Sequence, residues 1–329
     1  LHRLVELARG LADLAWRLKE GRQGFGRSRV GLVLSAGSAA EWAGGFPHNP
    51  FTGPVVADST GDGAQLAAGL LEGQLRQTTD DAVLLRKASL EIERPAESTR
   101  LWAQLEALRW QELSLEEKAR CPVMLLVGDS NTLGERGLSQ LAHVLDGELP
   151  LKALVFADLD LGLGVPPEIE VPVATAPDTI GDLALLTLSR RSASVAQTSI
   201  GQPAHFQESL EQVISYQGPA LLHVHAPSPT RHGFTLERTL ERARAAVEAR
   251  VFPLFRYDPE GKGVFGSRIT LDGNPSPRGE WVEDAGGVSI SPAHWALGES
   301  RFDHCFIPLT EDDREPLPLV QYLQCSAAD

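Results

Sequence analysis

The feature that most constrains the fold is the alternation of short apolar runs with segments of helical periodicity. The apolar runs occupy residues 30–34, 122–127, 153–156 and 220–224. Helical patterns occupy residues 65–75, 101–113, a stretch that ends near 145, and 204–216. A short apolar run between amphipathic helices is typical of a parallel strand that is covered on both faces. The sequence therefore predicts an α/β fold, a layered parallel sheet with helices on both faces.

The two flanks of this pattern differ from its middle. Residues 1–29 are predicted to form an N-terminal helix and linker, because leucines recur at spacings of three and four at Leu4, Leu7, Leu11, Leu14 and Leu18. Residues 30–260 are expected to form the α/β domain, with a long loop over 37–63 that binds a ligand or packs on the domain. Residues 261–329 are rich in Gly, Pro, Asp and Glu, and we expect an irregular C-terminal extension that wraps a neighbour or another subunit.

Composition excludes several classes of partner. The chain has 30 basic and 44 acidic residues and a net charge of −14, which disfavours binding to nucleic acid or to an anionic membrane surface. Its 3 cysteines are far apart and form no C-x-x-C pair, so we expect neither a disulfide framework nor a zinc site, and a cytoplasmic location. No signal peptide or membrane-spanning run is present, so a soluble protein is predicted. Because the chain starts at Leu1 and its sole methionine is Met124, we expect it to be a segment of a longer polypeptide.

Two aspartates mark the ends of neighbouring predicted strands. Gly128 and Asp129 follow the run at 122–127, and Asp158 follows the run at 153–156. In open α/β sheets, ligands bind outside the carboxyl ends of the strands. One or two carboxylates and a substrate diphosphate can hold Mg²⁺, while a helix that begins near Thr132 would offer N–H groups to the phosphate. The alternative is that Asp129 only caps this helix.

A family resemblance extends this interpretation. Five segments carry it in chain order, namely residues 35–54, 128–161, 194–201, 214–234 and 252–262. Together they resemble the C-terminal thiamin-diphosphate domain of the pyruvate (2-oxoacid):ferredoxin oxidoreductases. The resemblance implies the thiamin-diphosphate-binding fold and a cofactor that is held through Mg²⁺. It also implies that the glutamate that activates the cofactor lies on another domain, so that this chain supplies half of a site and no catalytic residue of its own.

The same resemblance assigns the cofactor-binding residues. They are Gly128, Asp129, Ser130, Asp158, Asp160 and Gly162, with Asp129, Asp158 and Asp160 as the metal ligands. Asp158 stands where the family has a threonine, Asp160 where it has a valine, and Leu163 where it has the asparagine that faces the substrate. Two extra carboxylates would repel a diphosphate by on the order of 1 kcal/mol or more per charge pair. The substitutions therefore indicate a degenerate metal site.

The cluster ligands of the family are replaced as well. Ser38 and Ser228 stand where the family has cysteines. Iron–sulfur clusters are held by soft thiolate ligands, and serine is a poor substitute. We therefore expect this chain to hold no iron–sulfur cluster.

Three further motifs have a plain and a functional interpretation. His223 and His225 lie on one face of a predicted strand and could share a ligand, although a structural role is the simpler interpretation. Arg231-His232-Gly233 could contact an anion or form a loop turn. Gly61-Asp62-Gly63 is interpreted as a turn, since no apolar strand precedes it.

Three hypotheses follow for the function. The first is a degenerate thiamin-diphosphate domain, kept as a structural and interaction module of a larger oxidoreductase-like complex, as a homodimer or a hetero-oligomer. The second is an active component that decarboxylates a 2-oxoacid oxidatively, with thiamin diphosphate, Mg²⁺ and external iron–sulfur clusters. The third is a cleft reassigned to another anionic ligand, with Arg231 and helix N-termini as its receptor.

Overall fold

The computed structural model describes residues 2–22, 24–37, 51, 53–159, 183–275, 281–283, 286–287 and 289–307. The strands are β1 (Val30–Leu34), β2 (Val55–Ala57), β3 (Val123–Asp129), β4 (Lys152–Ala157), β5 (Ser194–Ser199), β6 (Ala220–His225), β7 (Phe255–Tyr257) and β8 (Ile269–Thr270). They form an 8-stranded, mostly parallel sheet in the order β2-β1-β3-β4-β6-β5-β7-β8, flanked by helices. This confirms the predicted α/β class. In the described part of the chain, no helix is both long and apolar enough to cross a bilayer.

The chain divides into two compact units. The first comprises Leu1–Val155, Ser189–Ala193 and Ile214–Leu221, and the second comprises Phe156–Leu188, Ser194–Val213 and Leu222–Asp329.

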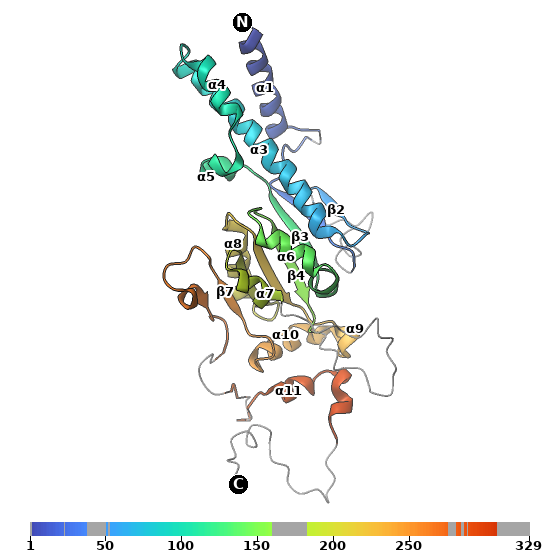
Figure 1. Ribbon diagram of the computed structural model, residues 1–329. Helices are drawn as coiled ribbons and strands as arrows, with labels where there is room; N and C mark the ends of the chain where they lie inside the picture. The colour runs from blue at the N-terminus through green and yellow to red at the C-terminus, as the bar shows by residue number, and fades with distance from the viewer. Residues whose placement is uncertain are drawn as a thin grey trace, which may run out of the picture. The chain divides into compact units, whose positions relative to one another are not determined.

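The helical elements of the first unit pack on its strands or on α3. They are α1 (His2–Lys19), α3 (Gly63–Glu93), α4 (Ser98–Glu106), η1 (Trp110–Glu112), α5 (Leu115–Lys118), the π-helical turn η2 (Ser130–Arg136) and α6 (Leu138–Asp146). The long helix α3 packs on β1, β3 and α6, and α1 and α4 lie along it (Figure 1). The predicted seam of α1 is buried at Leu7 and Leu14, whereas Leu4 and Leu18 stay exposed.

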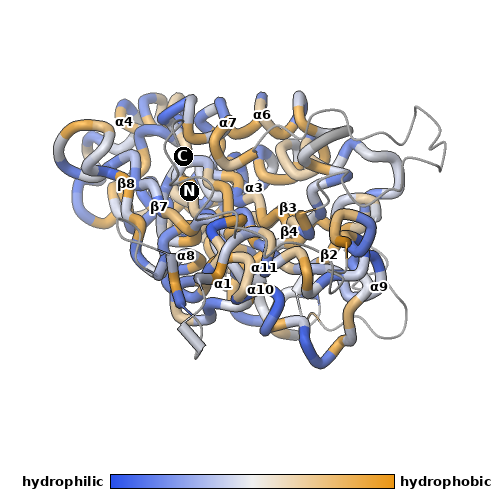
Figure 2. Tube along the Cα trace, turned by 90° about the horizontal axis from the view of Figure 1, so that it is seen from below, coloured by the Kyte–Doolittle hydropathy of each residue, from blue (hydrophilic) through white to orange (hydrophobic). Residues whose placement is uncertain are grey.

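Parallel pairing sets the register in the first unit. β1 pairs with β2 through Leu32 and Val55, and with β3 through Leu34 and Val127. The chain near the β3 label carries the hydrophobic colour in Figure 2, and Leu126 is fully buried. Because the pairs are parallel, the chain leaves all three strands at one edge of the sheet.

The second unit is built around buried strands and the helices that pack on them. Its helical elements are α7 (Leu183–Arg190), α8 (Pro203–Ser215, whose last residues belong to the first unit), α9 (Pro229–His232), η4 (Leu236–Arg238), α10 (Thr239–Glu248), η5 (Phe265–Arg268), α11 (Pro292–Ala296) and η6 (Ser300–Cys305). β7 pairs with β5 and β8 in antiparallel register. Helix α10 packs on β5 and α11, and Trp295 of α11 and Phe302 of η6 enter the core beside Phe252.

Two of the strands also differ from what the sequence pattern predicts. A short strand, β2, does precede Gly61-Asp62-Gly63, so the premise that no strand lies before this motif is wrong. The motif is nevertheless a turn, because Gly61 has φ +95° and Asp62 is the N-cap residue of α3. Strand β5 was not expected, because its sequence SVAQTS contains no apolar run.

Candidate functional site

The predicted metal residue Asp129 lies at the edge where β1 and β3 end. Gly128 is the residue before it, and a Cβ at Gly128 would collide with the Ser35 hydroxyl that follows β1. Gly37 has φ +106°, and a Cβ there would lie 2.9 Å from Asp129 Oδ2. Both glycines are therefore required by the close approach of the chain after β1 to the end of β3. We call Ser35, Gly37, Gly128, Asp129 and Thr132 the β3-end cluster.

Asp129 itself caps the helical turn that follows it. Its Oδ1 accepts the N–H of Thr132 at 2.9 Å, and the Thr132 hydroxyl lies 2.7 Å away. That hydroxyl is also 2.8 Å from the carbonyl oxygen of Ala36, which ties the chain after β1 to this turn. Ser130 is the first residue of the π-helical turn. The capping role that sequence reasoning held open is thus present, and the metal role of Asp129 stays a prediction.

A second carboxylate at this edge, Asp58, was missed by sequence reasoning. It follows β2, is buried, and accepts the N–H of Thr60 at 2.8 Å, the hydroxyl of Thr60 at 2.7 Å and the N–H of Gly61 at 3.0 Å. Burial pushes its pKa up, but these hydrogen bonds outweigh burial and the pKa of Asp58 is lowered. Asp58 therefore shapes the turn into α3. The short, partly exposed β2 gave no apolar run that could have revealed it.

Asp158 lies in the second unit and is engaged by a cation of its own chain. The Arg231 guanidinium of α9 donates to Asp158 Oδ2 at 2.5 Å. The buried ring of His232 lies between two carboxylates, with Nε2 3.9 Å from Asp158 Oδ2 and Nδ1 3.7 Å from Glu299 Oε2. We call Asp158, Arg231, His232, Glu299 and Arg301 the Asp158 cluster.

The C-terminal side of the chain completes this cluster. Glu299 is 1% exposed and pairs with Arg301 Nη2 at 2.7 Å. Burial raises the pKa of Glu299, although Arg301 opposes the rise. Arg301 also donates to the carbonyl oxygen of Leu159 at 2.9 Å, and Leu159 has the left-handed φ of +58°. A non-glycine residue in this region costs on the order of 1 kcal/mol, so the Arg301 contact helps to hold a strained turn directly after Asp158.

The two histidines of β6 are core residues. Both are buried, and their rings contact Phe252 with centroid distances of 5.6 Å for His223 and 5.0 Å for His225. His223 Nδ1 is also 3.2 Å from Gln197 Oε1. Burial lowers the pKa of His225 to about 3, with His232 as the next cause. This environment supports the structural interpretation of the pair.

The remaining predicted site residues divide into two groups. Asp160 and Gly162, together with Ser38 and Leu163, lie outside the described residues. Ser228 is described and occupies the N-cap position of α9. Asp129 belongs to the first unit and Asp158 to the second, so a metal site that they share stays a prediction. No group of three or more His, Cys, Asp or Glu side chains suited to a metal ion occurs within the described ranges.

The residues at the strand ends fit a magnesium ion unequally. Asp129 offers a carboxylate at a strand end, which is the kind of ligand that Mg²⁺ prefers. Asp158 fits less well, because its carboxylate already pairs with the guanidinium of Arg231, and a metal would compete with this cation for the same negative charge. The same ion pair engages the arginine that sequence reasoning considered as an anion receptor.

The comparisons with known proteins point to one group of enzymes. The chain is 26% identical over 196 residues to the pyruvate-flavodoxin oxidoreductase of Rhodospirillum rubrum, which covers 55% of this chain and 16% of that protein. It is 37% identical over 88 residues to the pyruvate synthase subunit PorB of Methanosarcina barkeri, covering 27% of this chain and 28% of the subunit. It is 25% identical over 163 residues to the PorB subunit of Pyrococcus horikoshii, covering 45% of this chain and 48% of the subunit. The chain thus spans less than half the length of these relatives.

The chain was also compared with family models and with solved structures. No family model matches the chain. A solved 2-oxoglutarate:ferredoxin oxidoreductase from Magnetococcus marinus aligns with a TM-score of 0.40 and 13% identity over 71% of this chain and 65% of that one. The sequence similarities support an oxidoreductase-like protein that is similar to pyruvate-flavodoxin oxidoreductase and to pyruvate synthase subunits.

Proposed function

We propose that this chain is a degenerate thiamin-diphosphate-type domain that serves as a structural and interaction part of a 2-oxoacid:ferredoxin oxidoreductase-like assembly. The proposal extends to partner subunits, because the names of several relatives describe them as subunits. In the proposed role, the chain contributes a folded surface to the assembly and no metal-bound cofactor.

The single observation that carries the proposal is the ion pair between Asp158 and Arg231. A residue at the position of a metal ligand is instead bound to a guanidinium at 2.5 Å, with the buried His232 beside it. The positive charge that Mg²⁺ would supply is therefore supplied by a side chain. The predicted loss of ligands at Asp160, Ser38 and Ser228 agrees with this interpretation.

An active component remains the second candidate, and Asp129 is the observation that favours it. Its carboxylate stands at the end of β3, directly after a glycine that packs closely on Ser35. If a cofactor bound here, Asp129 would hold the Mg²⁺ that carries the diphosphate, and the cofactor would supply the carbon chemistry.

Calorimetric titration of the full chain with thiamin diphosphate and Mg²⁺ tests the proposal. We expect no binding in the micromolar range, and no change in the Asp129→Ala variant. Micromolar binding that is lost in Asp129→Ala would contradict the degenerate role.

An assay of the intact assembly tests the same question with the partner domains present. The assay measures reduction of a viologen dye in the presence of coenzyme A and a 2-oxoacid. We expect no reduction that depends on Asp129, so Asp129→Ala should leave the rate unchanged. If such activity is found, the second candidate replaces the first.

A further inference from the structure

A small cavity of about 220 Å³ lies in the first unit, where β3 and β4 begin. Its charged and polar lining consists of Lys118, Cys121, Lys152, Tyr216 and Gln217. Of the described residues that line it, none is an aspartate or a glutamate. The chain carries a net charge of −14, so a cavity lined by two lysines and no carboxylate is opposite in charge to the chain as a whole.

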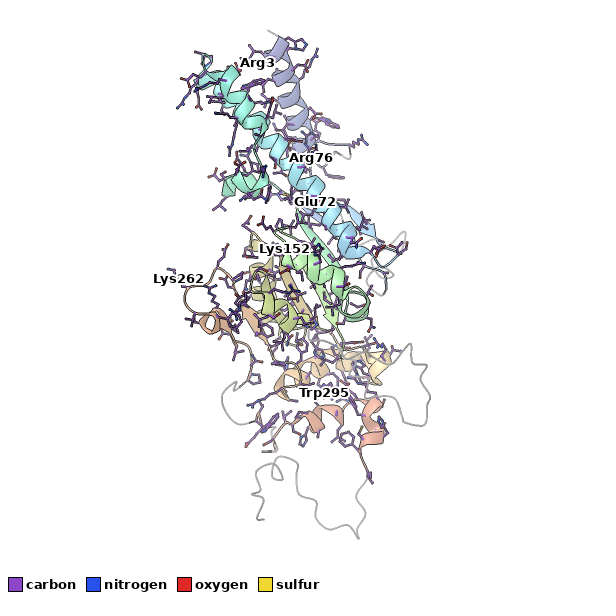
Figure 3. All side chains as sticks on the ribbon, in the orientation of Figure 1. Arg3, Glu72, Arg76, Lys152, Lys262 and Trp295 are labelled. Carbon is purple, nitrogen blue, oxygen red and sulfur yellow. The ribbon has the colours of Figure 1, made fainter. Side chains whose placement is uncertain are left out.

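Lys152, the first residue of β4, is the buried cation of this cavity. The residue is 3% exposed, and its side chain is labelled in Figure 3. Its Nζ donates to the carbonyl oxygens of Tyr216 at 2.5 Å and Gly218 at 2.6 Å, and lies 5.4 Å from the centroid of the Tyr216 ring. Within the described residues, no carboxylate lies within ion-pair distance of this ammonium.

A buried ammonium without a counter-ion is costly. Transfer of an unpaired charge out of water costs several kcal/mol, and carbonyl dipoles return only part of this. Burial accordingly lowers the pKa of Lys152 to about 7. An anion in the adjoining cavity would supply the missing charge in a region of low dielectric, where its attraction is strong.

The shape of the cavity and its second lysine, Lys118, limit which anions can bind. Trp110 and the ring of Tyr216 line the cavity as flat apolar surfaces. Lys118 lies at the same cavity, with its Nζ 6.0 Å from the Trp110 centroid and 3.2 Å from the carbonyl oxygen of Gln111. A volume of about 220 Å³ excludes a nucleotide and admits a small molecule.

We propose that this cavity binds a small organic carboxylate with a flat apolar body. The carboxylate pairs with the ammonium groups of Lys152 and Lys118, and the apolar body lies against Trp110 and Tyr216. The site lies at the beginning of the strands, so it is separate from the strand-end residues Asp129 and Asp58 and does not depend on the function proposed above.

The proposed site predicts a dependence of affinity on pH. Besides Lys152, the titratable groups that line the cavity are Lys118, Cys121 and Tyr216. Burial raises the pKa of Cys121, so its thiol stays neutral near pH 7. A carboxylate binds the protonated form of Lys152, and its affinity therefore falls as pH rises above about 7 and the ammonium is lost.

Calorimetric titration of the whole chain with benzoate and with neutral benzamide tests the proposal. At pH 6.5 we expect benzoate to bind at least about tenfold more tightly than benzamide, and to lose up to about tenfold in affinity per pH unit above 7. Lys152→Met should abolish the preference for benzoate and Lys118→Met should reduce its affinity several-fold. Lys19→Met, on the exposed end of α1, is the matched control and should change neither.

Two results would overturn the proposal. One is equal binding, or equal absence of binding, of benzoate and benzamide by the wild-type chain. The other is an unchanged benzoate affinity in Lys118→Met together with no dependence on pH. Both can be measured without Lys152→Met, so they decide the question even if that variant fails to fold because it releases the carbonyl groups of Tyr216 and Gly218.

Discussion

At the scale of single residues, ionisable side chains in this protein are controlled by burial and by partners from distant parts of the chain. Asp158 pairs with Arg231, which is 73 residues away, and His232 contacts Glu299. His225 is fully buried against Phe252 and is held in its neutral form. Buried ionisable groups of this kind make the free energy of unfolding depend on pH, and the direction of the shift in each pKa gives the sign of this dependence.

His225 is expected to make the protein labile to acid. The pKa of His225 is lowered to about 3 in the folded state from 6.5, so below pH 6.5 the unfolded chain binds a proton that the folded chain excludes. Stability therefore falls as pH decreases from 6.5 towards 3, by up to about 1.4 kcal/mol per pH unit from this group. Urea unfolding at several pH values should show a shallower loss of stability in His225→Leu.

The exposed His143 provides the control for this measurement. His143→Leu should keep the wild-type dependence on pH. If the free energy of unfolding falls with decreasing pH equally steeply in His225→Leu and in the wild type, His225 does not control acid lability.

Gly128 of the β3-end cluster has a steric role that Gly69 of α3 does not share. A Cβ at Gly128 would collide with Ser35 and Leu133, whereas one at Gly69 in α3 would meet open space. Gly128→Ala should destabilise the fold by about 1–3 kcal/mol through overpacking. Gly69→Ala should stabilise it by about 0.5–1 kcal/mol, because alanine favours a helix interior.

Thermal and urea unfolding of the two variants measure this contrast. Adding Ser35→Gly to Gly128→Ala should restore part of the loss, since it removes the colliding hydroxyl. A neutral effect of Gly128→Ala alone would show that the end of β3 has room for a side chain.

At the scale of elements, ion pairs to a buried aspartate hold the N-terminal helix against α3. Asp81 of α3 is buried and accepts from Arg17 at 2.9 Å, from Arg27 at 3.4 Å and from Gln77 at 3.1 Å. Arg17 also pairs with Asp13, and both carboxylates raise its pKa, Asp81 more strongly. One carboxylate thus connects α1, the loop after it and the middle of α3.

Asp81→Asn should weaken this connection. The substitution leaves the arginines without a counter-charge. Loss of one partner of a fully buried pair lowers the free energy of unfolding by about 3 kcal/mol, and the loss is smaller here because Arg17 is partly exposed. Hydrogen exchange should increase in α1 more than in α6. Asp80→Asn, at the exposed neighbouring position, is the matched control and should leave exchange in α1 unchanged.

Strand β5 shows which elements a hydrophobic pattern cannot reveal. All its residues are buried, yet several are polar. Gln197 donates to the carbonyl oxygen of Pro253 at 2.7 Å, Thr198 contacts His205 at 2.9 Å, and Ser199 donates to Ala243 at 3.3 Å. The strand is stable in the interior because later segments satisfy its polar groups, and those partners cannot be read from a local window.

At the scale of the whole molecule, the segment around Trp295 belongs to the core of the second unit. Trp295 is 3% exposed and packs against Phe302 with ring centroids 5.4 Å apart. Arg242 of α10 donates to the Trp295 carbonyl oxygen at 3.1 Å. The side chain of Trp295 is labelled in Figure 3. A stretch rich in Gly, Pro and acidic residues therefore supplies core side chains as well as Glu299 and Arg301.

Trp295→Ala should destabilise the second unit by about 3–5 kcal/mol through loss of a buried aromatic side chain. Leu297 lies two residues further on and is 59% exposed, so Leu297→Ala is the matched control and should cost less than about 0.5 kcal/mol. Hydrogen exchange should increase in α10 and α11 of the tryptophan variant. Equal stability of the two variants would show that this segment does not contribute to the core.

The sequence by itself determined the fold class and the places where several strands end. Apolar runs identified β1, β3, β4 and β6, and helical periodicity identified α1 and α8, because these signals are local and arise from burial of neighbouring residues. The same patterns placed Asp129 and Asp158 at strand ends. The resemblance to the oxidoreductases was also carried by the sequence, and the similar proteins support it.

Only the tertiary structure decided what surrounds these residues. Arg231 approaches Asp158 because α9 follows β6. Lys152 becomes a buried cation because the turn at residues 216–218 covers the start of β4. Charge compensation depends on distances of a few ångström between segments far apart in the chain, and periodicity contains no information about those distances.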